Sequence, residues 1–322
     1  TLQEGCKIRF GANNKHKYRY VLPQQQPLPD PLCWAARLFT WDPETKPSFG
    51  GSRSNSSVYL VRKRRSNTRH AMKVIHTVRF SFNPALQNMV KRESVALSLL
   101  KHPHVIQLQH FRRDNIHSQI IFVFPEMEGG NLFDFVIKSR KSHTKGYLIN
   151  FAPKVAKDLL SGLKHIHSKD IVHRDIKPAN VLLAEDLSEG DEGFPKIVIG
   201  DFGIARLPGE KRTETYLGGS YNWFSPLSFR DPERARSDFP IDLWGAGLIV
   251  WFMLAGNPKP WGNVGEPQHP NEINQLPWDR LEDLNITDEC IDFLGGFLVD
   301  HPDQCRPIDQ AENHPWIRNG IQ

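Results

Sequence analysis

The sequence has few cysteines and no long apolar run. Only four of its 322 residues are cysteine, and they are too widely spread for metal-ligand spacing. A chain of this length can bury a core without disulfide bonds, so we expect reduced thiols and a cytoplasmic or nuclear protein. No apolar run approaches the roughly 20 residues of a membrane helix, so no membrane partner is expected.

Charge of one sign is also scarce. The formal net charge is +5, with 24% charged and 39% hydrophobic residues, which is typical of a globular protein. The one dense basic run, Arg62-Lys63-Arg64-Arg65, lies where a strand hairpin should turn. We interpret it as a solvated turn. A nuclear-localisation or nucleic-acid patch is the alternative, and nucleic acid is not an expected partner.

The first 48 residues differ in pattern from the rest. Apolar and polar residues alternate on both sides of Gly11-Ala12-Asn13-Asn14, which predicts a β-hairpin. A polar, proline-bearing stretch follows at residues 24–31 and is typical of a linker. We therefore expect an N-terminal extension over residues 1–48, either the tail of a preceding domain or an element packed on the next one.

From residue 57 the pattern predicts strands first and helices later. Apolar runs indicate the following strands: 58–61, 71–75, 106–111 and 119–124. Helical periodicity covers residues 84–101, around Glu93, and returns from Asn131 and over residues 148–168. Strands followed by helices predict an α+β fold in two lobes.

Two motifs follow the longest predicted helix. The run Ile171–Asn180 contains His-Arg-Asp with an Asn five residues after the Asp, and Asp201-Phe202-Gly203 comes after a short apolar strand at Lys196 to Ile199. Together they resemble the catalytic loop and metal-binding segment of eukaryotic Ser/Thr protein kinases. The closing His314-Pro315-Trp316 is similar to that of the calcium/calmodulin-kinase-like group.

The resemblance implies a bilobal kinase domain over residues 49–318, with an N-lobe at 49–126 and a C-lobe at 127–318. It implies that Asp175 orients the substrate hydroxyl and accepts its proton, and that Lys177 lies beside the transferred phosphate. Asn180 and Asp201 would bind Mg²⁺. Lys177 also favours a Ser/Thr kinase over a tyrosine kinase.

The same resemblance implies where ATP binds. Lys73, in Ala71-Met72-Lys73, would bind the α- and β-phosphates and pair with Glu93. The phosphate-binding loop is poor in glycine: Gly51 is present, but Arg53 and Ser56 stand where two further glycines are usual. Because a Cβ keeps the backbone away from phosphate, we expect weakened ATP affinity or an altered loop.

The adenine ring should lie between the lobes. Phe124 takes the bulky gatekeeper position, the Pro125 carbonyl would accept from adenine, and the Met127 N–H would donate to it. Three apolar side chains would enclose the ring: Val58, Ala71 and Leu182. Plain core packing of these three is an equally compatible interpretation.

Arg174, beside the expected base, predicts control by phosphorylation of the segment 201–227. The usual position of the phosphate is Thr215 or Tyr216, modified by an upstream kinase or by a second copy of the protein. The run Asp242-Leu243-Trp244-Gly245-Ala246-Gly247 resembles the start of the central C-lobe helix of these kinases, which implies that Asp242 holds the backbone of the catalytic loop. Ser225-Pro226-Leu227 replaces the usual Ala-Pro-Glu, so Arg306 must find either another acceptor than that Glu or water.

The predicted function is transfer of the ATP γ-phosphate to Ser or Thr of protein substrates. Asn131 and Ala179 occupy the positions of two carboxylates that read substrate arginines, so no strong demand for an upstream Arg is expected. The alternative is a pseudokinase that binds nucleotide or acts as a scaffold. The altered loop around Gly51 and the Leu227 substitution are the features that favour it.

Overall fold

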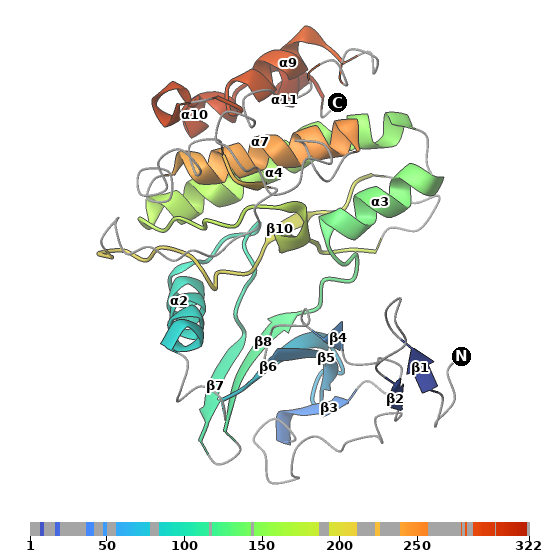
Figure 1. Cartoon of the computed structure of the whole chain (residues 1–322), viewed down its shortest axis with the longest axis vertical. Coiled ribbons are helices and arrows are strands. Elements are labelled where there is room, and N and C mark those ends of the chain that lie inside the picture. The colour runs from blue at the N-terminus through green and yellow to red at the C-terminus, as the bar shows by residue number, and fades with distance from the viewer. Residues whose placement is uncertain are drawn as a thin grey trace.

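The structure is a computed structural model of the whole chain. It describes residues 7–9, 17–19, 37–41, 48–49, 56–77, 84–115, 118–142, 145–186, 193–210, 223–225, 239–256, 278, 281, 286–299 and 301–320. These residues form two lobes, a sheet with one long helix and a larger set of helices (Figure 1). The expected bilobal α+β fold is confirmed.

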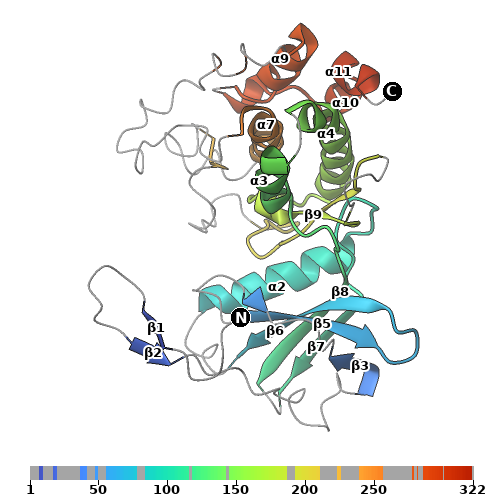
Figure 2. The same cartoon turned by 90° about the vertical axis from the view of Figure 1, so that its right-hand side faces the viewer.

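The N-lobe is an antiparallel sheet. Its strands are β3 (Phe39–Trp41), β4 (Ser48–Phe49), β5 (Ser56–Lys63), β6 (Arg69–His76), β7 (His110–Asp114) and β8 (Gln119–Pro125). In the described residues the order is β3-β5-β6-β8-β7, and β4 also pairs with β5. Helix α2 (Pro84–Leu99) covers the face that looks toward the other lobe (Figure 2). Side chains alternate between the two faces, so β6 directs Lys73 to the helix side and Met72 and Val74 to the other.

The outer face of this sheet has its own apolar cluster. Its buried members are Phe39, Val61, Met72, Val74, Ile121 and Val123. Phe39 comes from β3, is 0% exposed, and meets the rings of His70 and His110 at 5.7 and 5.9 Å. The strand β3 lies within the segment expected as an extension, yet it completes the core of the sheet. The boundary between residues 48 and 49 stays a prediction.

The expected N-terminal hairpin is present. Strand β1 (Lys7–Arg9) pairs antiparallel with β2 (Lys17–Arg19) and forms a separate two-stranded sheet.

The C-lobe is built around two long helices. Helix α4 (Lys145–Ser168) packs against α7 (Pro240–Ala255), which is buried on nearly every side. The other helices are α3 (Leu132–Ser142), α9 (Asp288–Gly295), α10 (Ile308–Ala311) and α11 (Pro315–Asn319). Because α7 lies inside the lobe, its residues from Leu243 to Leu254 are apolar with few exceptions.

One predicted strand was misplaced. The sequence predicted a strand over residues 106–111, but β7 begins at His110. Residues before it bond instead to the C-lobe: Val105 forms a parallel bridge to Ile199, and the Ile106 N–H donates to the Ile199 carbonyl at 2.8 Å. The apolar pattern was correct about burial, but the partner of this backbone is in the other lobe.

No helix in the described part of the chain combines the length and apolar character needed to cross a bilayer.

Replacing Phe39 with Ala should destabilise the N-lobe strongly. The side chain is fully buried, so we expect a loss of about 3 to 5 kcal/mol in the free energy of unfolding, measured by urea denaturation. Phe111→Ala is the matched control, because Phe111 is 46% exposed and should cost less than half as much. Equal losses would contradict the role of Phe39 as the cover of the outer face.

Candidate functional site

The catalytic-loop motif follows α4 and is held by one carboxylate of α7. Asp242 is 0% exposed and accepts the N–H groups of His173 and Arg174, both at 2.8 Å. It also contacts His167 Nε2 at 2.9 Å. The predicted anchoring of this loop by Asp242 is confirmed. Arg174 has a φ of +69°, a left-handed conformation that costs a non-glycine residue about 1 kcal/mol, and the bond to Asp242 holds it there.

Burial alone would raise the pKa of Asp242. The hydrogen bond and charge of His167, together with the charge and backbone N–H of His173, outweigh it and hold the pKa below its ordinary value. The carboxylate is therefore charged at neutral pH. Helix α7 can approach because Gly245 has no side chain: a Cβ there would lie 2.6 Å from the Ile176 carbonyl oxygen.

Three predicted residues meet at one carboxylate. Lys177 Nζ lies 2.5 Å from Asp175 Oδ2, and Asn180 Nδ2 donates to the same oxygen at 2.9 Å and to the Asp175 carbonyl at 2.8 Å. Asn180 belongs to the 3-10 helix η2 (Pro178–Asn180), which leads into β9 (Val181–Leu183). The carboxylate of Asp175 is thus fixed by two donors, one of them charged.

The Asp-Phe-Gly segment lies beside this loop. Strand β10 (Ile197–Ile199) pairs with β9, the Gly200 N–H donates to the Asn180 carbonyl at 2.9 Å, and the His173 ring bonds the Gly200 carbonyl at 2.9 Å. Phe202 is fully buried against the His173 ring. Asp201 is exposed and has a φ of +62°. The Asp201 Oδ1 accepts the Gly203 N–H at 3.4 Å.

Lys73 of β6 and Glu93 of α2 form the expected ion pair. Lys73 Nζ donates to both Glu93 oxygens, at 2.7 and 2.8 Å. Burial alone would lower the pKa of Lys73, but the charges of Glu93 and Asp201 raise it above its ordinary value. Burial raises the pKa of Glu93; Lys73 opposes this and Asp201 adds to it. Asp201 is thus close enough to act on both members of the pair.

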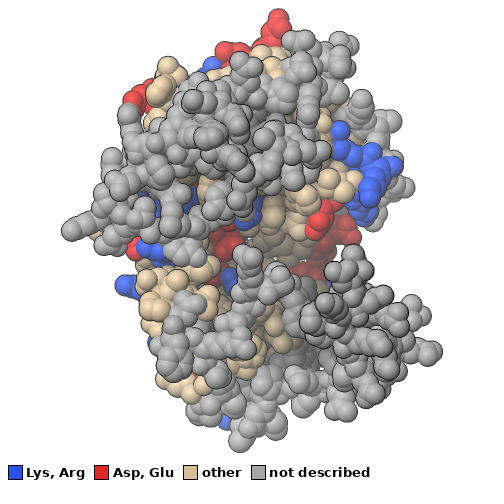
Figure 3. Space-filling view, viewed as in Figure 1, with Lys and Arg blue, Asp and Glu red and all other residues tan. Residues whose placement is uncertain are grey.

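This site has more negative than positive charge and suits a hard cation. Glu93 and Asp201 repel each other, and Lys73 neutralises only one of them. The Asn180 amide nitrogen is bonded to Asp175, which leaves its amide oxygen as a ligand atom. Carboxylate and amide oxygens are donors that Mg²⁺ takes. Figure 3 shows acidic side chains where the surface is hollowed between the lobes.

The residues predicted around adenine lie at the junction of the lobes. Half-buried positions are typical of the lining of an open cleft, and the six residues share this burial: Val58, Ala71, Phe124, Pro125, Met127 and Leu182. Ala71 lies opposite Phe124 in the sheet, and an isolated bridge joins Asn131 to Leu182. The segment after β8 is held by the Gly129 N–H, which donates to the Leu183 carbonyl at 3.1 Å.

Some predicted residues lie outside the described part of the chain. They are Gly51, Arg53, Thr215, Tyr216, Pro226 and Leu227. Arg306 is described, and it finds the alternative acceptor that was expected. Its Nη2 lies 3.0 Å from Asp292, which also accepts from His314 at 2.7 Å.

An arginine cluster was missed in the sequence. Arg92 of α2 and Arg206 lie close enough to Arg174 to repel its charge. Burial, and then the charges of Arg92 and Arg206, lower the pKa of Arg174 to about 10. Arg92 pairs with Glu210 at 3.4 Å and Arg206 with Asp170 at 2.8 Å. Buried Arg174 Nε has no hydrogen-bond partner within the described residues. The sequence offered one signal for this cluster: Arg92 directly precedes Glu93, which was expected at the site.

Replacing Asp242 with Asn should remove the anchor of the catalytic loop. An amide cannot replace the charge, so we expect about 3 kcal/mol less stability at pH 7, measured by urea denaturation across a pH series. Because the folded pKa of Asp242 is lowered, its contribution is complete above the unfolded value near 4 and is lost as the pH falls through the folded value.

The free energies of unfolding of wild type and Asp242→Asn should therefore become equal in acid. Asp309→Asn is the control, since the Asp309 side chain is 75% exposed and should cost under about 0.5 kcal/mol. A pH-independent difference between wild type and Asp242→Asn would contradict the charged, buried state of Asp242.

The comparisons with known proteins agree with this geometry. The protein kinase domain pattern matches residues 50–317. The chain is 27% identical to the DNA damage response protein kinase DUN1 of Saccharomyces cerevisiae over 81% of this chain and 52% of that protein. It is 30% identical to serine/threonine-protein kinase D3 of Mus musculus, over 84% of this chain and 28% of that protein.

It is also 26% identical to myosin light chain kinase A of Dictyostelium discoideum, over 82% of this chain and 84% of that protein. The chain thus spans about half of the first relative and under a third of the second. The pseudokinase alternative finds no support among these relatives, whose names describe kinases. With the domain pattern matched over most of its length, the chain belongs to the protein kinase domain family, and its relatives include Ser/Thr kinases.

Proposed function

We propose that this chain transfers the γ-phosphate of ATP to Ser or Thr hydroxyls of protein substrates. The observation that carries the proposal is the joint placement of the Lys73–Glu93 ion pair and the Asp175 carboxylate, with Asp201 close enough to act electrostatically on the ion pair. Phosphoryl transfer depends on such positioning and on charge stabilisation more than on covalent chemistry by the protein.

The roles of the loop residues follow from their contacts. Asp175, oriented by Lys177 and Asn180, would hold the substrate hydroxyl and accept its proton. Lys177 Nζ, which contacts Asp175, would meet the charge of the transferred group. Asn180 and Asp201 would hold Mg²⁺, which when bound neutralises charge on the phosphate oxygens.

Nucleotide binding would use the junction of the lobes. Lys73 would bind the α- and β-phosphates, the Pro125 carbonyl and the Met127 N–H would bond adenine, and the ring would be enclosed by Val58, Ala71 and Leu182. Pro125 lacks an N–H but keeps the carbonyl that this role requires. Gly51 would contribute to the phosphate loop, and the altered neighbours of Gly51 predict weaker ATP affinity.

The arginine cluster supports control by phosphorylation. Three arginines, Arg92, Arg174 and Arg206, belong to three separate elements, and Arg174 Nε is buried without a hydrogen-bond partner in the described residues. A phosphate on the segment 201–227 would supply the missing acceptor and tie α2 to the catalytic loop. Thr215 or Tyr216 is the proposed site, modified by an upstream kinase or by a second copy.

The kinase domain is proposed to span residues 49–318, after an extension over residues 1–48. Its substrates are proteins without a strong requirement for an upstream Arg. Asn131, at one of the two expected acidic positions, instead accepts the Asp134 N–H at 2.9 Å and so begins α3. Ala179, at the other position, is exposed.

The test is phosphate transfer to a mixture of Ser/Thr peptides, followed with ATP labelled at the γ-phosphate. Asp201→Ala should lower the rate at least about a thousandfold, because a ligand for the charge-neutralising cation is lost. The control Asp186→Ala removes an exposed carboxylate and should keep the rate. Melting-temperature shifts with MgATP report binding separately. A shift in the wild type without transfer would favour the pseudokinase instead.

Arg174→Met should separate regulation from folding. A buried, poorly partnered guanidinium opposes folding at neutral pH, as its lowered pKa indicates, so the unphosphorylated variant should match the wild type or exceed it by about 1 kcal/mol. Phosphorylation should stabilise and activate only the wild type. Melting curves measure the stabilisation and phosphate-transfer rates measure the activation, each before and after phosphatase treatment. Equal responses of the two proteins to phosphatase would contradict the phosphate-binding role.

A further inference from the structure

The turn that follows the Asp-Phe-Gly segment holds a carboxylate that the proposed mechanism does not use. The Glu210 N–H donates to the Leu207 carbonyl at 3.1 Å, and the Leu207 N–H donates to Glu210 Oε2 at 3.0 Å. Gly209 has a φ of +78°, a left-handed conformation that glycine adopts without strain, so the chain can reverse here. The backbone and the side chain of Glu210 therefore close the same turn, which fixes the direction of the carboxylate.

The turn is attached to the catalytic loop. Arg206 and Val172 form an antiparallel bridge, in which the Arg206 N–H donates to the Val172 carbonyl at 2.8 Å and the Val172 N–H donates to the Arg206 carbonyl at 3.2 Å. The residue after Val172 is His173, whose N–H is bound by Asp242. The position of Glu210 is thus set by the same anchored loop that carries the expected base.

The second oxygen of Glu210 contacts α2. Glu210 Oε1 lies 3.4 Å from Arg92 Nε, and only 10% of the Arg92 side chain is exposed. Within the described residues, Glu210 is the one acidic side chain that pairs with Arg92. A buried guanidinium without an anion is costly, so Arg92 depends on this contact. Arg92 directly precedes Glu93, which pairs with Lys73, so the contact acts on the adjacent ion pair.

Charged residues make up a large part of the buried face of α2. The buried residues of this helix are Val90, Arg92, Glu93, Ala96 and Leu97. Two of these five are charged, and each of the two forms an ion pair with another element. Residues 84–89, at the start of the helix, are exposed or half-buried. Ion pairs therefore contribute strongly to the position of α2.

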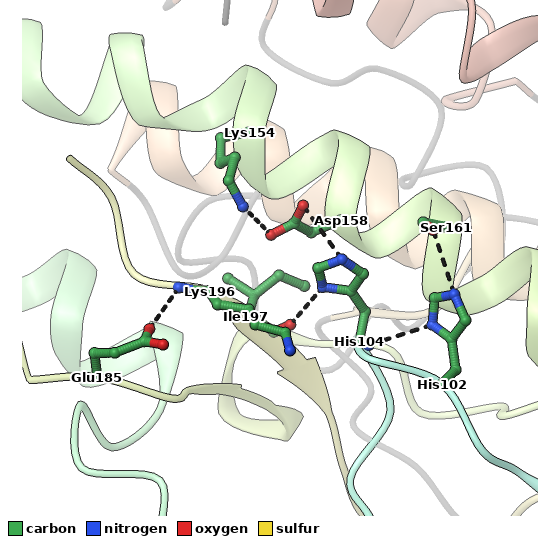
Figure 4. Close-up of polar contacts among 8 residues, drawn as sticks. All are labelled: His102, His104, Lys154, Asp158, Ser161, Glu185, Lys196 and Ile197. Atoms are coloured by element: carbon green, nitrogen blue, oxygen red, sulfur yellow. Dashed lines mark hydrogen bonds and ion pairs between the residues drawn. The ribbon is translucent and has the colours of Figure 1, made fainter.

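The other end of α2 is bonded to the C-lobe. In the loop after the helix, His104 Nδ1 lies 2.9 Å from the Ile197 carbonyl oxygen of β10, as Figure 4 shows. The Ile199 N–H donates to the His104 carbonyl at 2.9 Å. Because this end is fixed, the remaining motion of α2 is a swing that would separate Glu93 from Lys73. The ion pair between α2 and the turn opposes this swing.

Glu210 also acts on Arg174. Burial, and then the charges of Arg92 and Arg206, lower the pKa of Arg174, and the charges of Glu210 and Asp242 oppose this effect. Glu210 therefore supplies negative charge to Arg92 by direct contact and to Arg174 through space.

We propose that Glu210 is a positioning residue, whose carboxylate holds Arg92 and thereby keeps Glu93 on Lys73 before the segment 201–227 is phosphorylated. The inference rests on the proposed kinase activity. Glu210 acts as the internal anion of the arginine cluster, and a phosphate on the segment supplies a further one. The dephosphorylated protein therefore retains a basal rate of phosphate transfer that depends on Glu210.

The experiment uses phosphatase-treated protein and compares the wild type with Glu210→Gln, Arg92→Met and the double variant. The glutamine side chain can still accept the Leu207 N–H but carries no charge, so kcat should fall at least about fivefold while the KM for peptide stays near the wild-type value. The double variant should be no slower than the slower single variant, because both changes remove the same contact. The control Glu289→Gln, at an exposed glutamate of α9, should keep the wild-type rate.

Rescue by an added anion separates a missing charge from a damaged fold. Glu210→Ala leaves space beside Arg92, so sulfate should restore part of its rate, whereas chloride at equal ionic strength should not. Sulfate should not restore the rate of Arg92→Met, which lacks the cation. An equal response of the two variants to sulfate would overturn the proposal.

Hydrogen exchange reports the position of α2 without any need for activity. Amides of residues 89–93 should exchange faster in Glu210→Gln than in the wild type or in Glu289→Gln. Unchanged exchange in α2, or additive losses of kcat in the double variant, would overturn the proposal. An untreated wild type that is active but loses all transfer after phosphatase treatment would also overturn it.

A wild type that transfers no phosphate in either state would overturn the proposed function alone. The exchange data would then decide whether Glu210 positions α2.

Discussion

The arrangement of the site depends on one buried carboxylate. Asp242 binds two consecutive backbone N–H groups of the catalytic loop and the ring of His167, so one side chain on the central helix defines the position of the loop that carries Asp175 and of the left-handed Arg174. Its burial makes the arrangement rigid, because these donors would lose their partner if the loop moved away. Everything that the loop carries, from Asp175 to Asn180, is placed relative to this point.

Other charged side chains near the site also fix the positions of the groups that they bind. Three charged groups near the site are placed by a partner: Lys73 by Glu93, Asp175 by Lys177, and Arg92 by Glu210. Such pairs add little stability because desolvation offsets their attraction. Their value here is geometric, since they fix β6, α2 and the catalytic loop at points where apolar packing alone would tolerate several arrangements.

The sequence was informative where the residues belong to motifs that resemble those of protein kinases. The loop from Asp175 to Asn180, the Lys73–Glu93 pair and the anchoring by Asp242 were all implied by the resemblance of their motifs to those of protein kinases, and the contacts are present. The strand expected from residue 106 was wrong at its start, because apolar alternation reports burial but does not identify the backbone partner. Burial of Val105 and Ile106 comes from β10 in the other lobe.

Arg92 and Arg206 could not be assigned from sequence for a related reason. Arg92 pairs with Glu210, 118 residues further along the chain, and Arg206 pairs with Asp170, so neither partner could be identified before the packing of the chain was known. A charged residue on a helix is usually solvated, so burial of Arg92 was not the default expectation. The close approach of α4 at Gly162 to Ile199 and His104 likewise becomes visible only in three dimensions.

The contribution of β3 to the outer face of the sheet bears on how the domain can be shortened. Phe39 fills a cluster whose other members come from β5, β6 and β8. A chain that begins at residue 49 would leave Val61, Met72 and Val123 facing water across an open sheet surface. Exposed apolar surface of this kind promotes self-association, so such a truncated chain is expected to form soluble aggregates even if its active site assembles.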